Sequence, residues 1–350
     1  MKTLILTDLH FDNKIKGLIE AQSRCIYDIV KKEDPDEIII MGDLMMRRRP
    51  SPTVLLALQS LIDTIAKWGR VVIIRGNHDS ETKSDDGVTA LSLFHRPPHI
   101  RVITQTTYQN GDSYFKPTVP MDAERIFIPH YENETKILEV LDNANEGCKI
   151  FGHFGYKGSL NSAGDADFSI PLSAFRNNSF LGHIHRFNSV SQSVEGREDV
   201  KVTLLGTPYT TNFGESDKPC YYATIEEGKV TFVEIDHGPR HLVVDYENLE
   251  EYKDVIKDPK YWTLLRVYVN KLSPDNSTKT ARHILEEYEP QVLDIKFHPI
   301  IDDNNPSTYS PQRELFSVND AIIEDYVDNS QTMLSKEDIL GGLRLLKDED

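Results

Sequence analysis

Five short segments of the 350-residue chain combine carboxylate, imidazole and amide side chains, and four of them place a glycine directly before the first such residue. The segments read TDLH (7–10), MGD (41–43), RGNHD (75–79), FGH (151–153) and LGHIH (181–185). Mixed oxygen and nitrogen donors suit manganese, iron or zinc better than calcium, which prefers oxygen ligands alone. The pattern therefore predicts metal-dependent chemistry.

Seven residues of these segments are candidate metal ligands, namely Asp8, His10, Asp43, Asn77, His153, His183 and His185. Seven ligands are too many for one tetrahedral ion, but two ions that share a bridging carboxylate would use them all. Two ions about 3.5 to 4 Å apart hydrolyse phosphate esters, because they bind the phosphoryl oxygens and lower the pKa of bound water to about 7. The sequence therefore predicts a phosphoester hydrolase.

Two further groups of residues are candidates for substrate chemistry. His78 is predicted to be catalytic rather than a ligand, because an imidazole near the leaving oxygen can donate a proton or stabilise charge, and Asp79 is expected to orient its ring. Arg47, Arg48 and Arg49 soon follow Asp43 and could bind a phosphate backbone, although a solvated loop explains them equally well.

The other histidines are expected to be ordinary surface or core residues. They are His95, His99, His130, His237, His241, His283 and His298.

The elements that must position these side chains alternate between strand-like and helix-like patterns. Apolar, β-rich runs occupy 4–6, 37–40, 71–74, 125–128 and 149–151, which predicts a layered α/β core. Loops at the carboxyl ends of parallel strands converge on one crevice, so ligands spread along the chain can meet there.

Two local signals add detail to this core. Ser51-Pro52 is typical of a helix start, and the following apolar residues recur at helical spacing until Gly69. The stretch 220–236 contains two alternating runs around 226–228, which predicts a hairpin.

The C-terminal third differs in pattern. A boundary is predicted at 237–241, followed by a small β-α-β unit with a strand at 263–269, a helix at 278–288 and a strand at 291–297. A polar linker begins at Asp302, and two short amphipathic helices open with capping boxes at Ser317 and Ser335. Their apolar residues fit docking on a partner and packing on the small unit equally well.

Composition narrows the class of protein. The formal net charge of −17 argues against a general nucleic-acid coating protein, but bound cations and a local basic patch could still serve a nuclease. No apolar run is long enough to cross a bilayer, Asp8 and His10 interrupt any signal-peptide core, and the three cysteines are far apart. A cytoplasmic protein without a membrane partner is expected.

The five segments, in this order, resemble the calcineurin-like metallophosphoesterase superfamily, whose pattern is D-x-H, G-D, G-N-H-[DE], G-H and G-H-x-H. Within it, the chain looks most like the SbcD-type double-strand-break repair nuclease subunit. Arg49-Pro50-Ser51, Gly206-Thr207-Pro208 and the small α/β unit followed by a tail carry that narrower similarity. A viral recombination nuclease subunit would fit the chain's compact size, with the host cytoplasm as its location.

The resemblance implies a four-layer α/β/β/α core over 1–238, a small α/β capping domain over 239–301, and a linker with helices over 302–350. It implies that one ion is bound by Asp8, His10, Asp43 and His185. It implies that the other is bound by Asp43, Asn77, His153 and His183, so that Asp43 bridges and His78 is the catalytic non-ligand.

The resemblance also implies activity and partners. The expected activity is manganese-dependent exonuclease and endonuclease cleavage of DNA ends and hairpins in repair, recombination or replication, with magnesium as the alternative metal. The expected partners are DNA, a second copy of the chain, and an SbcC-like structural-maintenance-type ATPase bound through the C-terminal helices. A metallophosphatase or small-molecule phosphodiesterase with the same core, and a DNA-end binding assembly subunit, are the alternatives.

Overall fold

The computed structural model describes most of the first 299 residues. The described ranges are 1–116, 122–161, 164–166, 168–176, 178–196, 198–216, 218–269 and 282–299. The predicted linker and tail helices, at 302–350, lie outside the described residues.

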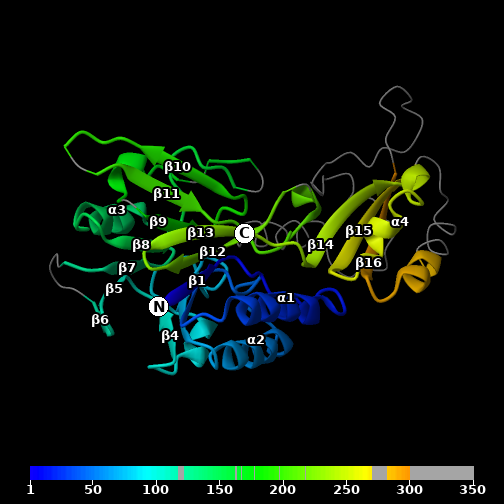
Figure 1. Cartoon of the computed structure of the whole chain (residues 1–350), viewed down its shortest axis with the longest axis horizontal. Helices are drawn as coiled ribbons and strands as arrows, with labels where there is room; N and C mark the ends of the chain where they lie inside the picture. Colours follow the sequence, from blue (N-terminus) through cyan, green and yellow to red (C-terminus); the bar gives the residue numbers. More distant parts are fainter. Residues whose placement is uncertain are drawn as a thin grey trace, which may run out of the picture. The chain divides into compact units, whose positions relative to one another are not determined.

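Two sheets form the centre of the N-terminal part (Figure 1). The first has the strand order β13 (Lys229–Glu234), β12 (Tyr221–Glu226), β1 (Lys2–Leu6), β2 (Glu37–Met41), β3 (Arg70–Ile74) and β4 (Ile100–Ile103). The second has the order β10 (Asn188–Gln192), β11 (Val200–Leu204), β9 (Ser179–Gly182), β8 (Lys149–His153), β7 (Arg125–Ile128), β5 (Thr107–Asn110) and β6 (Ser113–Phe115). In both sheets the central strands are parallel, as the alternation with helices predicts.

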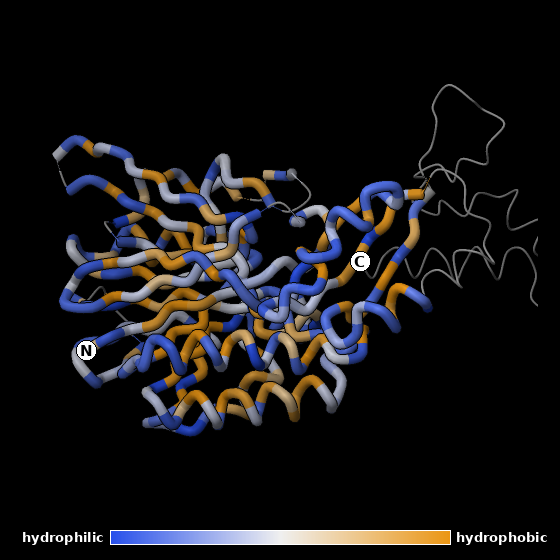
Figure 2. Tube along the Cα trace, turned by 45° about the vertical axis from the view of Figure 1, so that its right-hand side comes forward, coloured by the Kyte–Doolittle hydropathy of each residue, from blue (hydrophilic) through white to orange (hydrophobic). Residues whose placement is uncertain are grey.

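The two sheets pack face to face, and helices cover their outer faces. Ile5 and Ile39 of the first sheet share a buried cluster with Phe127 and Phe151 of the second. The alternate strand residues point outward, and they pack against α1 (Leu18–Glu33) and α2 (Pro52–Ile65) on one side and α3 (Glu134–Asp142) on the other. Figure 2 shows the hydrophobic residues gathered in the middle of the strands. The predicted α/β/β/α core is confirmed.

The local signals in this core are also confirmed, with one shift. The Ser51 side chain accepts a hydrogen bond from the Val54 backbone N–H at the start of α2, but the helix ends at Ile65 rather than near Gly69. The β12–β13 hairpin turns through Glu227 and Gly228, both of which have positive φ.

A third sheet consists of three parallel strands, β14 (Gly238–Asp245), β15 (Tyr261–Val269) and β16 (Val292–Pro299). The short helix α4 (Lys253–Ile256) lies between β14 and β15, and residues 282–288 are helical. Strand β14 was not predicted, because Gly238 and Pro239 at its start read as a turn. We call these elements the small sheet.

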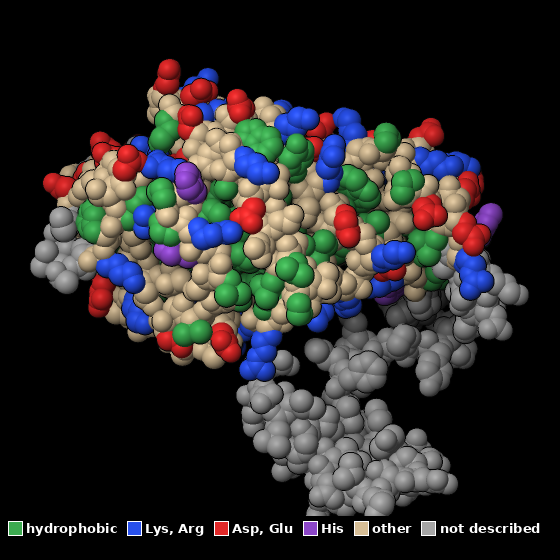
Figure 3. Space-filling model, turned by 90° about the horizontal axis from the view of Figure 1, so that it is seen from below, with side chains coloured by type: hydrophobic (Ala, Val, Ile, Leu, Met, Phe, Trp, Pro, Cys, Tyr) green, Lys and Arg blue, Asp and Glu red, His purple; other side chains and the backbone are tan. Residues whose placement is uncertain are grey.

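Four 3₁₀ turns complete the described secondary structure: η1 (Ala90–Phe94), η2 (Leu172–Ala174), η3 (Phe213–Glu215) and η4 (Tyr246–Asn248). Among the described helices, none is both long and apolar enough to span a membrane. On the face shown in Figure 3, acidic and basic side chains are interspersed, with no broad basic surface.

Candidate metal centre

All seven predicted ligands lie together where β1, β2 and β3 of the first sheet and β8 and β9 of the second end. Two overlapping groups of side chains have their ligand atoms within 4.8 Å of one another, namely Asp8, His10 and His185, and Asp8, Asp43 and His153. Asn77 joins the second group through His153 and His183. The sequence segments therefore converge as expected from the carboxyl ends of parallel strands.

The backbone at this centre is held in conformations that non-glycine residues rarely adopt. Asp8, His10, Asp43 and His183 have φ values of 53°, 44°, 49° and 77°. Hydrogen bonds between the first two segments fix them, with Asp8 N–H donating to the Gly42 carbonyl at 3.0 Å and His10 N–H to the Asp43 carbonyl at 2.9 Å. Such strain persists only where the surrounding structure imposes it, and it concentrates at functional sites.

The glycines of the motifs are required by close approach. A Cβ on Gly42 would lie 2.2 Å from His153 Nδ1, and one on Gly76 would lie 2.1 Å from Asp43 Oδ1. Gly42 also has a φ of +88°. A side chain at either position would displace a candidate ligand, which explains why glycine precedes these residues.

One side of the centre is formed by two histidines that face each other. The Nε2 atoms of His10 and His185 are 2.9 Å apart, and His10 Nε2 lies 3.8 Å from both Asp8 Oδ1 and Asp43 Oδ2. Burial lowers the pKa of His10 well below its ordinary value, although Asp43 opposes this shift. A neutral imidazole has the free lone pair that a metal ligand needs.

The other side of the centre contains Asn77, His153 and His183. Asn77 Oδ1 lies 3.1 Å from His153 Nε2 and 3.0 Å from His183 Nδ1, and Asp43 Oδ2 lies 3.3 Å from His153 Nε2. Burial alone would lower the pKa of His153. The negative charges of Asp43 and Asp8 outweigh this effect, so the pKa rises to about 9. Burial and the neighbouring His153 lower the pKa of His183 to about 3.

Asp43 lies between these two sides. Its Oδ2 approaches one histidine of each side, His10 and His153, and its Oδ1 accepts a hydrogen bond from the His78 backbone N–H at 2.8 Å. Burial alone would raise the pKa of Asp43, but His153 and His10 lower it well below the ordinary value. Asp8 Oδ1 is also within 4.0 Å of histidines on both sides.

His78 lies beside the ligands without joining them. Its Nδ1 is 2.7 Å from the Met46 carbonyl oxygen, and its ring meets that of His10 edge-on with the centroids 5.1 Å apart. Because the carbonyl accepts a hydrogen bond from Nδ1–H, the opposite nitrogen, Nε2, is left for a substrate atom.

The expected role of Asp79 is wrong. Its carboxylate does not orient the His78 ring but accepts hydrogen bonds from the backbone N–H groups of Met45, at 3.1 Å, and Gly76, at 2.9 Å. Burial and the nearby Asp43 raise the pKa of Asp79 to about 7. Asp79 therefore ties the second and third motif loops together, and the Met46 carbonyl holds the His78 ring.

Sequence reasoning missed Glu215, a buried residue of η3. Its Oε1 accepts a hydrogen bond from His185 Nδ1–H at 2.7 Å, while Oε2 accepts from the Thr211 backbone N–H at 2.9 Å and pairs with Lys218 Nζ at 2.8 Å. The bond fixes the tautomer of His185 so that Nε2 keeps its lone pair on the side of Asp8 and His10. No motif or periodicity links position 215 to position 185.

His130 was also assigned no role, yet it lies against the centre. Its ring stacks on His183 at 5.7 Å with an interplanar angle of 18°, and 8% of its surface is exposed. It follows β7 just as other site residues follow their strands, and this placement was the signal that could have revealed it.

The three arginines divide into two kinds. Arg48 donates to the carbonyl oxygens of Thr82 at 2.9 Å and Ser80 at 3.3 Å, so it fixes the loop after the third motif. Arg47 and Arg49 are exposed.

The chain is similar to one protein family and to two known nucleases. The family model described as calcineurin-like phosphoesterase matches residues 1–187. The chain is 24% identical over 368 residues to the SbcD subunit of the nuclease SbcCD from Staphylococcus saprophyticus, covering 95% of this chain and 93% of that protein. The crystal structure of the nuclease MPE of Pseudomonas putida matches 66% of this chain and 87% of its own, with 16% identity and a TM-score of 0.31. Because the family model matches more than half of the chain, the chain belongs to the calcineurin-like phosphoesterase family.

Proposed function

We propose that the chain is a two-metal phosphodiesterase that hydrolyses DNA at its ends, as the nuclease subunit of an SbcCD-like complex. The observation that carries this proposal is the convergence of seven oxygen and nitrogen donor residues, with Asp43 at their centre and His78 beside them. The similarity to the SbcD subunit of a nuclease extends over nearly the full length of both chains and favours a nuclease over other phosphoesterases.

The donor set fits two divalent cations. We assign one to Asp8, His10, Asp43 and His185, and the other to Asp43, Asn77, His153 and His183. Mixed imidazole, carboxylate and amide donors suit manganese, with magnesium as the alternative. When bound, such ions would supply a nucleophile from water near neutral pH and neutralise charge on the phosphoryl oxygens.

The chain's own residues would then complete the reaction. The Met46 carbonyl holds Nδ1–H of His78, which stabilises the ring when it carries two protons and directs its Nε2–H toward the leaving oxygen. The Asp43 carboxylate is fixed by the His78 backbone N–H, so the proton donor and the proposed bridging ligand keep a constant separation. The Glu215 carboxylate orients the His185 ring by accepting a hydrogen bond from its Nδ1–H.

The wider organisation follows from the same proposal. We assign residues 1–238 to the nuclease domain, 239–301 to a capping domain and 302–350 to the linker and partner-binding helices. Arg47 and Arg49 are free to contact a DNA backbone, whereas Arg48 is held by the 80–82 loop. A homodimer, an SbcC-like ATPase partner and a cytoplasmic location complete the proposal.

The test compares substrates on the metal-stripped, purified full chain after manganese or magnesium is restored. Linear duplex and hairpin DNA would be assayed beside a phosphopeptide and a cyclic nucleotide. We expect manganese-dependent cleavage of DNA that His78→Ala abolishes. Faster turnover of either small substrate would instead indicate a phosphatase or a small-molecule phosphodiesterase, and no cleavage of any substrate would indicate an assembly subunit.

A further inference from the structure

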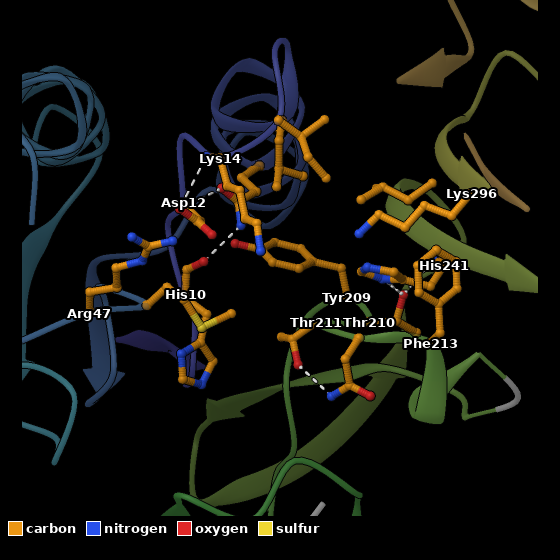
Figure 4. A pocket seen from close by; sticks show the side chains of 16 residues that line it. His10, Asp12, Lys14, Arg47, Tyr209, Thr210, Thr211, Phe213, His241 and Lys296 are labelled. Atoms are coloured by element: carbon orange, nitrogen blue, oxygen red, sulfur yellow. Dashed lines mark hydrogen bonds between the residues drawn. The ribbon is translucent and has the colours of Figure 1, made fainter. Parts of the chain in front are cut away.

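A cleft of about 350 Å³ opens beside His10, between the core and the small sheet (Figure 4). Its walls come from the segment between β1 and α1, from Met46 and Arg47, from residues 209–213, and from β14, β15 and β16. His10 belongs both to this cleft and to the candidate metal centre. A substrate whose reacting bond lies at the centre would therefore extend into the cleft.

The charge of the cleft is opposite to that of the chain. Lys14, Arg47 and Lys296 line it together with a single carboxylate, Asp12, although the chain has 56 acidic and 39 basic residues. Asp12 Oδ1 accepts a hydrogen bond from the Lys14 backbone N–H. All three cations are exposed, and within the part of the chain that the structure describes they form no ion pair.

The cations approach from separate elements. Lys14 lies before α1, Arg47 follows the second motif, and Lys296 is on β16 of the small sheet. In Figure 4, Lys296 extends from the small sheet toward the side of the cleft where Lys14 lies. Like charges repel one another, and an anion bound among these cations would relieve that repulsion.

Part of the remaining wall is apolar, next to polar residues such as Thr211 and Asn212. Leu264, Met46 and Phe213 contribute to it. The Phe213 ring is held by an edge-on contact with His241 at 4.7 Å and by the Arg266 guanidinium at 4.2 Å. Cations beside apolar side chains such as Phe213 match a nucleotide, whose phosphates are anionic and whose sugar and base present apolar faces.

We propose that this cleft binds an unpaired nucleotide segment next to the phosphodiester that is cut, and that Lys14 and Lys296 contact its phosphates. The inference rests on the proposed function. The volume is at the lower end of the range of roughly 300 to 1,000 Å³ for small-molecule pockets. A duplex, whose major groove alone is about 12 Å wide, does not fit, so the strand enters single-stranded.

The test is the salt dependence of DNA binding by the full chain. Fluorescence anisotropy would be measured with EDTA present, so that the DNA is not cut, on a labelled single strand, a duplex with a 3′ overhang and a closed circular duplex. The variants are Lys14→Gln, Lys296→Gln and the double variant. Lys201→Gln, which removes an exposed lysine of β11, is the matched control.

The slope of log affinity against log salt for the single strand should become shallower by about 0.7 in each single variant and by about 1.4 in the double variant. The reason is that a protein with fewer phosphate contacts releases fewer counterions when it binds. The overhang duplex should behave in the same way, while the closed circle and the Lys201→Gln control should not change. Unaltered slopes in both single variants would overturn the proposal. An equal loss on the closed circle would overturn it too, because it would indicate general surface charge.

These outcomes separate the inference from the proposed function. If the wild-type chain cuts DNA in manganese but the cleft variants keep its salt slope, the nuclease assignment stands and the cleft assignment fails. If the wild-type chain cuts no DNA but the cleft variants flatten the slope, the nuclease assignment fails and the cleft remains a strand-binding site.

Discussion

The Glu215→Gln substitution tests whether His185 is held as a metal ligand. Gln has nearly the same shape as Glu but replaces one accepting oxygen by an NH₂ donor. Glu215 now accepts from His185 on one oxygen and from Thr211 and Lys218 on the other, and 5% of its surface is exposed. Whichever way the Gln amide turns, one of these donors faces another donor.

The expected effect follows from the better of the two orientations. Lys218 carries a full charge, so the Gln oxygen should face Lys218 and Thr211, and the NH₂ group should face His185 Nδ1. That contact favours the tautomer with the proton on Nε2, the atom that must ligate. Loss of such an orienting group typically weakens metal affinity about 10- to 100-fold, which corresponds to about 1.4 to 2.8 kcal/mol.

The assay is calorimetric titration of manganese into the metal-free full chain. We expect one of two binding steps to weaken by that factor, while the step assigned to Asn77, His153 and His183 is retained and reports an intact core. Glu139→Gln, at an exposed position of α3, is the matched control. Two wild-type binding steps in Glu215→Gln would refute the reasoning.

Four further substitutions test other parts of the structure. His78→Ala should retain both ions while turnover falls by about 10²- to 10⁴-fold, whereas Asp43→Ala should lose metal; full occupancy in Asp43→Ala by elemental analysis would contradict the bridge. Gly76→Ala should lower manganese affinity, because its Cβ would lie 2.1 Å from Asp43 Oδ1; unchanged affinity would show that the loop can shift. Burial lowers the pKa of His241 from 6.5 to about 4, so the unfolded chain binds more protons between these values. The free energy of unfolding of the wild type should therefore fall by up to about 3 kcal/mol as the pH drops through this window, and that of His241→Gln should fall by less. If the urea midpoints of the two proteins fall in parallel with pH, protonation of His241 does not destabilise the fold.

The sequence predicted the core and the convergence of the site because both follow from simple geometry. Strands β1, β2, β3 and β8 are short apolar runs, and each ends at a polar motif. Parallel strands place their carboxyl ends at the same edge of a sheet, so these motifs lie close together. The glycines in four of the five motifs indicated close approaches, which the contacts at Gly42 and Gly76 now explain.

What could not be predicted depends on side-chain direction and on long-range packing. Asp79 is adjacent to His78 in sequence, but the turn aims its carboxylate at the backbone of Met45 and Gly76, a choice that adjacency does not reveal. Glu215 reaches His185 only through the position of η3, which the fold sets. Strand β14 was hidden because its first residues, Gly238 and Pro239, are typical of turns.

The donors at the candidate centre come from both sheets of the sandwich, and this has a thermodynamic consequence. A cation held jointly by Asp43 after β2 and His153 at the end of β8 would fasten one layer to the other, and it would bind the native chain but not the unfolded one. Free metal at 100 times its dissociation constant would then raise the unfolding free energy by about 2.7 kcal/mol. Chelation would shorten the lifetime of the chain in a cell as well as stop its chemistry, so metal supply would govern how much protein is present.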